Sequence, residues 1–130
     1  MTSALKPGHI LLDGDRVTLL DFDRIAAADP MIDVANLLGR VAKSWPRFGR
    51  PDDHRRAVTR AFVEEYFAHA PVAWRARLPL HYALALLVEV AGPLQGERGR
   101  TRKQRGGGGE TDQVEALVRE AHGSVVGTIW

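Results

Sequence analysis

The chain has 130 residues, of which 45% are hydrophobic and 26% charged, the composition of a folded domain rather than of a disordered segment. It contains no cysteine, which excludes a disulfide scaffold, a cysteine-ligated zinc site and a cysteine nucleophile. Of the 18 basic and 16 acidic residues, five basic and one acidic lie within residues 97–105. This leaves 13 basic and 15 acidic residues elsewhere, so the chain as a whole is not a general polyanion binder.

The first structured segment is predicted to be a β-hairpin. Residues 10–12 and 17–20 are short runs of strand formers that flank a turn beginning with Asp13 and Gly14. An Asp-Gly pair between apolar runs favours a tight turn, because glycine accepts the positive φ that such turns require. The second strand leads directly into the acidic pair Asp21 and Asp23.

Helical periodicity begins after the hairpin. Asp29 is the expected N-cap and Pro30 fits the first helical position, where no N–H is needed. Apolar residues then recur every three or four positions as far as Trp45, which predicts one amphipathic helix. A second helix is predicted from Asp52 or Asp53 to His69. Its expected apolar stripe consists of Ala57, Val58, Ala61, Phe62 and Tyr66.

A third helical region is predicted after Pro71, with a break at Pro79 and an end at Gly92-Pro93. Its part over residues 80–91 is apolar on nearly every face, which is typical of the buried centre of a helical bundle. Residues 95–109 are basic and rich in glycine and arginine, and they are predicted to form a flexible loop. A last amphipathic helix is predicted over residues 111–122, with Gly123 as its stop.

These elements predict a mostly helical α+β fold, in which a β-hairpin is followed by a helical bundle. Residues 1–130 are expected to form a single partial domain. The longest nearly apolar stretch is too short to span a bilayer and no signal peptide is visible, so the expected location is the cytoplasm.

Three acidic residues are the candidates for chemistry. Asp21 and Asp23 follow a strand with one residue between them, so in an extended chain their carboxylates point to the same side. Such a pair suits Mg²⁺ with phosphate oxygens as its other ligands, or it is simply a solvated turn. Asp33 lies in the first turn of a helix beside the apolar stripe. It is expected either to accept hydrogen bonds from a neighbouring loop or to interact with the helix dipole.

Taken in order, residues 5–14, 17–23 and 29–35 resemble the C-terminal lobe of the aminoglycoside phosphotransferase family, which is kinase-like and includes choline and homoserine kinases. The close resemblance covers about residues 4–38. It implies the C-lobe of the protein-kinase-like fold, with ATP and Mg²⁺ as cofactors. The reaction it implies is transfer of the γ-phosphoryl group of ATP to the hydroxyl of a small molecule.

The resemblance also implies a role for each candidate residue. Asp21 would bind the Mg²⁺ that bridges the ATP phosphates, Asp23 would assist it, and Asp33 would brace the catalytic loop. In the family this loop reads His-Gly-Asp-x-x-Pro-Gly-Asn, and its asparagine ligates a metal. Aligned on the Pro-Gly step of this chain, the asparagine falls on His9, which is the expected third metal ligand.

The catalytic aspartate of the family falls on Ala4, which carries no group that can accept a proton. No catalytic residue is therefore expected, because the general base is absent. The family's N-lobe, with its phosphate-binding lysine, also has no counterpart in the sequence. The chain is expected to be a truncated or degenerate phosphotransferase, inactive alone, with a missing N-lobe or a second copy as its partner.

Two other functions stay open at this stage. One is a non-catalytic binding or scaffold module that keeps the fold without turnover. The other is a nucleic-acid-binding protein that uses residues 97–105, which predicts salt-sensitive binding. That segment has no aromatic residue to stack on bases, so nucleic acid is not the expected partner.

Overall fold

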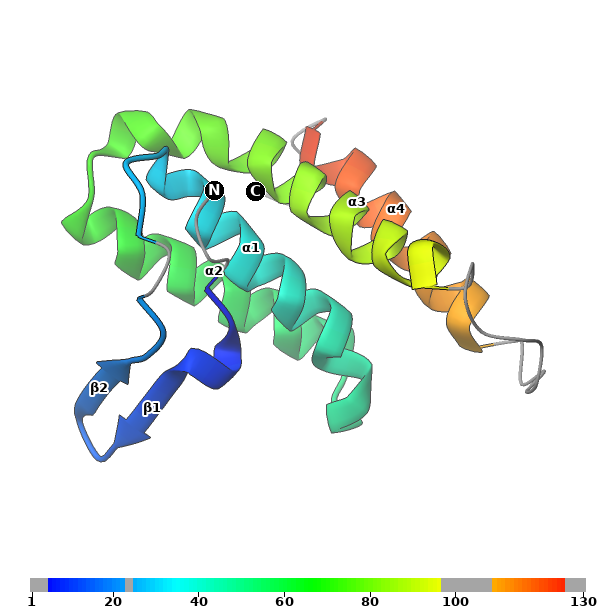
Figure 1. Ribbon diagram of the computed structural model, residues 1–130, viewed down its shortest axis with the longest axis horizontal. Coiled ribbons are helices and arrows are strands. Elements are labelled where there is room, and N and C mark those ends of the chain that lie inside the picture. Colours follow the sequence, from blue (N-terminus) through cyan, green and yellow to red (C-terminus); the bar gives the residue numbers. More distant parts are fainter. Residues whose placement is uncertain (1–4, 23–24, 97–108, 126–130) are drawn as a thin grey trace.

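The computed structural model describes residues 5–22, 25–96 and 109–125. It confirms the expected α+β fold, a two-stranded hairpin followed by helices, and Figure 1 shows the hairpin standing apart from the helices. The elements in chain order are η1 (Pro7–His9), β1 (Ile10–Asp13), β2 (Arg16–Leu19), α1 (Pro30–Ser44), η2 (Trp45–Phe48), α2 (Asp52–His69), η3 (Val72–Arg77), α3 (Leu78–Gly96) and α4 (Gly109–Val125).

The hairpin forms around the predicted Asp-Gly turn. Strands β1 and β2 are antiparallel, with Ile10 opposite Leu19, and Gly14 takes the positive φ of 60° that the turn requires. The N–H of Leu20 donates to the carbonyl of His9 at 2.8 Å and extends the pairing by one step. No residue of either strand is buried, so the hairpin adds nothing to the hydrophobic core.

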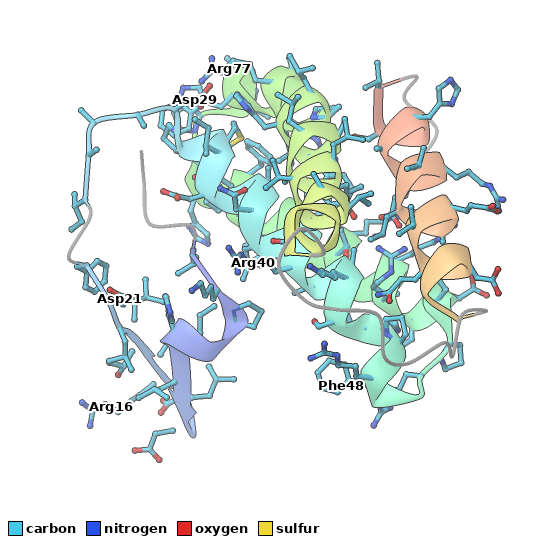
Figure 2. All side chains as sticks on the ribbon, turned by 45° about the vertical axis from the view of Figure 1, so that its right-hand side comes forward. Arg16, Asp21, Asp29, Arg40, Phe48 and Arg77 are labelled. Atoms are coloured by element: carbon cyan, nitrogen blue, oxygen red, sulfur yellow. The ribbon has the colours of Figure 1, made fainter. Side chains whose placement is uncertain are left out.

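Helix α1 begins as its sequence predicts. The Asp29 carboxylate accepts a hydrogen bond from the N–H of Met31 at 3.0 Å, and Pro30 occupies the first helical turn. Arg77, at the end of η3, donates to the same carboxylate at 2.7 Å (Figure 2). The hydrogen bond from Arg77 and the one from the Met31 backbone hold the pKa of Asp29 below its ordinary value. One carboxylate thus caps α1 and ties it to the segment that leads into α3.

The buried face of α2 is not the predicted one. The residues of the expected stripe at positions 57, 58, 61 and 62 are exposed, and the prediction is wrong. Arg55 is only 4% exposed, because its guanidinium donates twice to Glu120 of α4 at 2.8 Å and once to Asp52 at 2.7 Å. These hydrogen bonds compensate the guanidinium for its burial, so this face of the helix can be buried although it carries a charge. The face that is buried instead consists of Arg55, Thr59, Val63 and Phe67.

Glu120 joins three helices in one buried polar network. Besides binding Arg55 of α2, its carboxylate accepts a hydrogen bond from the hydroxyl of Tyr82 on α3, a side chain that is fully buried. Burial and then the nearby Glu120 carboxylate raise the pKa of Tyr82. Burial would lower the pKa of Arg55, but the carboxylates of Asp52 and Glu120 raise it above its ordinary value, so the guanidinium stays charged.

Tyr82 is expected to make the fold sensitive to alkaline pH. The folded-state pKa of Tyr82 lies above the ordinary value of 10.0. The contribution of this shift to the free energy of unfolding is therefore fully present below pH 10 and is lost progressively as the pH rises above 10. The free energy of unfolding should fall there by about 1.4 kcal/mol per pH unit for this proton. Urea unfolding at several pH values around 10 measures the slope, which Tyr82→Phe should remove and Tyr66→Phe should keep. An equal slope in wild type and Tyr82→Phe would contradict the assignment.

Helix α3 passes the point where the sequence predicts its end. Pro79 lies in its first turn, whereas the helix continues through Gly92-Pro93 to Gly96, so the predicted end is wrong. A proline has no N–H to donate to the carbonyl four residues earlier, which here belongs to Glu89. Lys43 of α1 supplies the replacement, because its Nζ donates to that carbonyl at 3.1 Å and to the Glu89 carboxylate at 2.9 Å.

Helix α3 is also not buried on every side. Helices α1 and α4 pack against two of its faces and bury Tyr82 and Leu86, and Gly39 of α1 lies against Ala85. The prediction of a helix in the buried centre of the bundle is therefore wrong. The exposed face of α3 consists of Leu80, Leu84, Leu87 and Val88, each between 46% and 67% exposed.

Helix α4 begins two residues before its predicted start and continues through the expected stop at Gly123 to Val125. The predicted loop lies mostly outside the described residues, as does the whole basic segment 97–105. Within the parts of the chain that the structure describes, no helix is long and apolar enough to cross a membrane.

Candidate functional site

Asp21 lies where the hairpin ends, one residue beyond the last backbone hydrogen bond of the pairing. Its φ of 67° makes it the one non-glycine residue with positive φ in the described ranges. Aspartate and asparagine tolerate this left-handed conformation better than other side chains, yet it still costs free energy and is found preferentially at functional sites. The Asp21 side chain is 43% exposed, so its carboxylate is accessible to a ligand.

His9 and Asp21 are brought together by the hairpin. His9 precedes β1 and Asp21 follows β2, and the pairing of the two strands places the ends of both next to each other. The Nε2 atom of His9 lies 3.5 Å from the Oδ2 atom of Asp21. Figure 2 shows Asp21 beside the hairpin, away from the Asp29–Arg77 pair at the start of α1. The two described residues that the family resemblance implies for a metal site therefore lie close together.

Asp33 occupies the predicted place in the first turn of α1 and is half-buried. Its Oδ1 atom is buried and accepts no hydrogen bond from any residue in the described ranges. A buried carboxylate oxygen without a donor is costly, so such atoms are rare in folded proteins. Of the remaining predicted positions, Asp23 and Ala4 lie outside the described residues.

The residues that converge at the hairpin suit a metal ion held partly by phosphate. Among the described residues, no group of three or more histidine and acidic side chains could hold a metal ion alone. Mg²⁺ is commonly bound by one or two carboxylates with substrate phosphates and water as its other ligands, and the exposed Asp21 carboxylate fits that arrangement. The imidazole of His9 fits less well, because Mg²⁺ prefers oxygen ligands.

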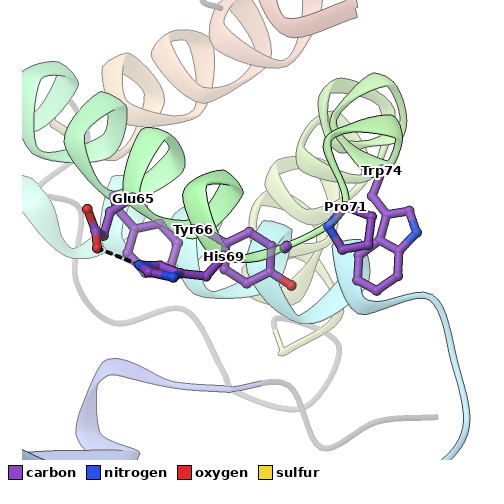
Figure 3. Close-up of a pocket in the computed structure, with 7 residues that line it drawn as sticks. Glu65, Tyr66, His69, Pro71 and Trp74 are labelled. Carbon is purple, nitrogen blue, oxygen red and sulfur yellow. Dashed lines mark hydrogen bonds and ion pairs between the residues drawn. The ribbon is translucent and has the colours of Figure 1, made fainter.

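A separate groove of about 500 Å³ lies between the end of α2 and η3 (Figure 3). The rings of Phe62, Tyr66 and Trp74 line it, and Glu65 pairs with His69 at 3.0 Å on its rim. No hairpin residue contributes to it. The sequence pattern does not predict this groove, because it places positions 62 and 66 in a buried stripe of the helix. The sequence feature that indicates the groove is the four-residue spacing of Phe62 and Tyr66, followed by a third aromatic residue, Trp74, just beyond Pro71.

Comparison with known proteins identifies the family. A family model described as the phosphotransferase enzyme family (APH) matches residues 4–80, which is more than half of the chain. No curated protein and no solved structure matches this chain. The matched residues contain the hairpin, Asp21 and Asp33, and they extend through α1 and α2 into the start of α3. The chain therefore belongs to the phosphotransferase enzyme family.

Proposed function

We propose that this chain is a phosphotransferase C-lobe that binds a Mg²⁺–nucleotide at the hairpin exit but does not transfer the phosphoryl group by itself. The observation that carries this proposal is the position of Asp21 at the hairpin exit. Its backbone is left-handed, and its Oδ2 atom lies 3.5 Å from Nε2 of His9. Membership of the family supports ATP as the nucleotide and a small-molecule hydroxyl as the acceptor in intact relatives. ATP and Mg²⁺ as ligands agree with the predicted cytoplasmic location.

Asp21 is the residue that would hold Mg²⁺, and Asp23, two positions further along the chain, would assist it. A bound Mg²⁺ supplies charge neutralisation between the phosphates, which is a large part of what phosphoryl transfer needs. His9 is better suited to orienting the Asp21 carboxylate than to binding this ion, since its ring nitrogen already lies beside Oδ2. The strand pairing brings the backbones of these two residues next to each other, which supports a shared site.

Asp33 is proposed to brace the loop that precedes β1. Its buried Oδ1 has no donor among the described residues, and a backbone N–H from that loop would satisfy it. The resemblance to the family implies the same role for Asp33. In this proposal Asp33 acts on the loop conformation and does not touch the nucleotide.

Catalysis is where the chain departs from its family. Ala4 stands at the position of the general base and has no atom that can accept the proton of an acceptor hydroxyl. General-base assistance contributes about 10²–10⁴-fold to the rate, and that contribution is lost. A non-catalytic binding module that keeps the fold is therefore the form of this function that the residues support best.

Nucleotide binding is expected to depend on the Asp21 carboxylate. Isothermal titration of the full chain with ATP in excess Mg²⁺ should give a binding signal that EDTA abolishes and Asp21→Asn removes. Asparagine tolerates the left-handed conformation, so this substitution removes the charge and keeps the backbone. Asp15→Asn, in the exposed turn of the same hairpin, is the matched control and should bind like wild type.

Metal-independent binding, or equal binding by Asp21→Asn, would overturn the assignment of Asp21. The same samples test the second half of the proposal. ATP consumption by wild type should not exceed that of Asp21→Asn, and a clear excess would show that the chain is catalytic without a base at position 4.

A further inference from the structure

The groove between the end of α2 and η3 takes no residue from the hairpin, and the proposed nucleotide site does not use it. Its volume of about 500 Å³ lies within the range of small-molecule binding sites. Two elements supply its walls, because α2 ends at His69 and η3 begins at Val72, with Pro71 between them. This space is called the aromatic groove.

Aromatic rings form both walls of the aromatic groove. On α2, the rings of Phe62 and Tyr66 are stacked, with centroids 6.3 Å apart and planes inclined by 28°, so they form one continuous aromatic surface. Trp74 of η3 supplies the other wall. Tyr66 and Trp74 pack against the hydrophobic core, which holds them in place, whereas Phe62 is 37% exposed. The aromatic groove is therefore preformed and offers ring surface to a ligand.

The rim of the aromatic groove carries negative charge. Glu65 is the one acidic residue among the described residues that line it, and its side chain is 78% exposed. Its partner is His69 at 3.0 Å, and a histidine ring can donate such a hydrogen bond in its neutral form, so the pairing needs no compensating positive charge. Figure 3 shows Glu65 and His69 together at one side of the groove and Trp74 at the other. Apolar walls with an acidic rim favour a ligand that is both apolar and cationic.

The same end of α2 already stabilises one cation with a ring and a carboxylate. The guanidinium of Arg75 lies 5.8 Å from the ring centroid of Phe67, and its Nη2 atom pairs with Oε1 of Glu64 at 2.6 Å. The aromatic groove repeats this combination with its own rings and Glu65. Among the described residues that line it, no arginine or lysine supplies the cation.

We propose that the aromatic groove binds a small organic cation, an ammonium group that carries alkyl substituents. Such a cation is attracted to the electron-rich faces of aromatic rings, and its alkyl groups bury apolar surface against the same rings. Alkyl substitution is part of the proposal, because an unsubstituted ammonium group is strongly hydrated and loses more on leaving water. Glu65 adds attraction from the rim. Binding at this site requires neither nucleotide nor metal, so it does not depend on the function proposed for the hairpin.

The test is a nuclear magnetic resonance titration of the full chain with tetramethylammonium, without ATP or Mg²⁺. The methyl protons of the probe should shift upfield in a saturable way, because they lie over aromatic rings when bound. The control ligand is tert-butanol at the same ionic strength, since it has nearly the same size and shape and carries no charge. Its affinity should be weaker by at least about tenfold.

Two variants and one matched control locate the site. Phe62→Ala should weaken binding of tetramethylammonium by at least about fivefold, and Glu65→Gln by at least about threefold. Phe48→Ala makes the same change at an exposed ring outside the groove and should bind like wild type. Because none of these three side chains belongs to the buried core, far-ultraviolet circular dichroism should show unchanged helices in all three variants.

Four results would overturn the proposal. Wild type could show no saturable shift up to about 20 mM probe, a limit that corresponds to very weak affinity. The alcohol could bind as tightly as the cation, which would make the groove apolar without preference for charge. Phe62→Ala could bind like wild type. Asp21→Asn could abolish binding, which would place the probe at the hairpin and not in the aromatic groove.

Discussion

Replacing Glu120 with alanine is expected to lower the free energy of unfolding by about 3–5 kcal/mol, the range found when one member of a buried ion pair is removed. Arg55 is 4% exposed, and in this variant its terminal nitrogens lose both hydrogen bonds to Glu120. Its buried guanidinium then keeps the hydrogen bond from Nε to Asp52. Tyr82 loses a carboxylate acceptor in the same substitution. The measurement is urea unfolding followed by circular dichroism.

Two further variants separate charge from packing at this position. Glu115→Ala, on the exposed side of α4, removes a carboxylate from the same helix and should change stability by less than about 0.5 kcal/mol. The double variant Arg55→Met with Glu120→Leu replaces the pair by apolar groups and should recover most of the loss. A loss below about 1 kcal/mol in Glu120→Ala would mean that the pair does not hold α4 to α2.

Gly39→Val is expected to destabilise the fold by about 1–3 kcal/mol through overpacking between α1 and α3. A Cβ atom at Gly39 would lie 3.2 Å from the Cβ of Ala85 and 3.6 Å from its carbonyl carbon, so the two further methyl groups of valine have no space. The two helices would have to move apart along their contact. Thermal or urea unfolding measures the effect.

Gly39→Ala is the informative companion of this variant. Alanine gains about 1 kcal/mol of helix propensity over glycine, and the close contact offsets that gain, so near-neutral stability is expected. Ala85→Gly removes the contact, so Gly39→Val should cost less when it is added to Ala85→Gly than when it is made alone. An equal cost in both backgrounds would show that the contact with Ala85 does not limit the size of residue 39.

The parts of the fold that sequence predicts correctly are those set by neighbouring residues. The Asp13-Gly14 turn and the Asp29–Pro30 start of α1 each depend on a backbone conformation or a capping bond within a few positions. The α1 stripe is also predictable, because the buried residues of that helix are apolar and follow its period.

The predictions from sequence are wrong where a residue far along the chain determines which side chains are buried or where a helix ends. Arg55 is buried where it pairs with Glu120, 65 positions away, and it lies on a face of α2 that hydrophobicity does not predict to be buried. Helix α3 continues past Pro93 with help from Lys43, whose Nζ reaches a carbonyl 46 positions along the chain. Neither partner can be identified from the local pattern of either helix.

The candidate site also has features that the sequence predicts and features that it does not. The resemblance to the family implies that His9 and Asp21 belong to one metal site, and in the structure Nε2 of His9 lies 3.5 Å from Oδ2 of Asp21. The left-handed backbone of Asp21 was not foreseen, because aspartate adopts that conformation only where its surroundings impose it. The metal roles of His9, Asp21 and Asp23 and the bracing role of Asp33 stay predictions.

The hydrophobic core and the candidate metal ligands His9 and Asp21 occupy different parts of this chain. Every member of the hydrophobic core lies in α1, α2, α3 or α4, whereas His9 and Asp21 belong to a hairpin with no buried side chain. Substitutions at the hairpin therefore leave the folding equilibrium of the helices nearly unchanged. In such an architecture, selection for a folded chain does not protect these candidate ligands, so they can change in evolution while the helices persist.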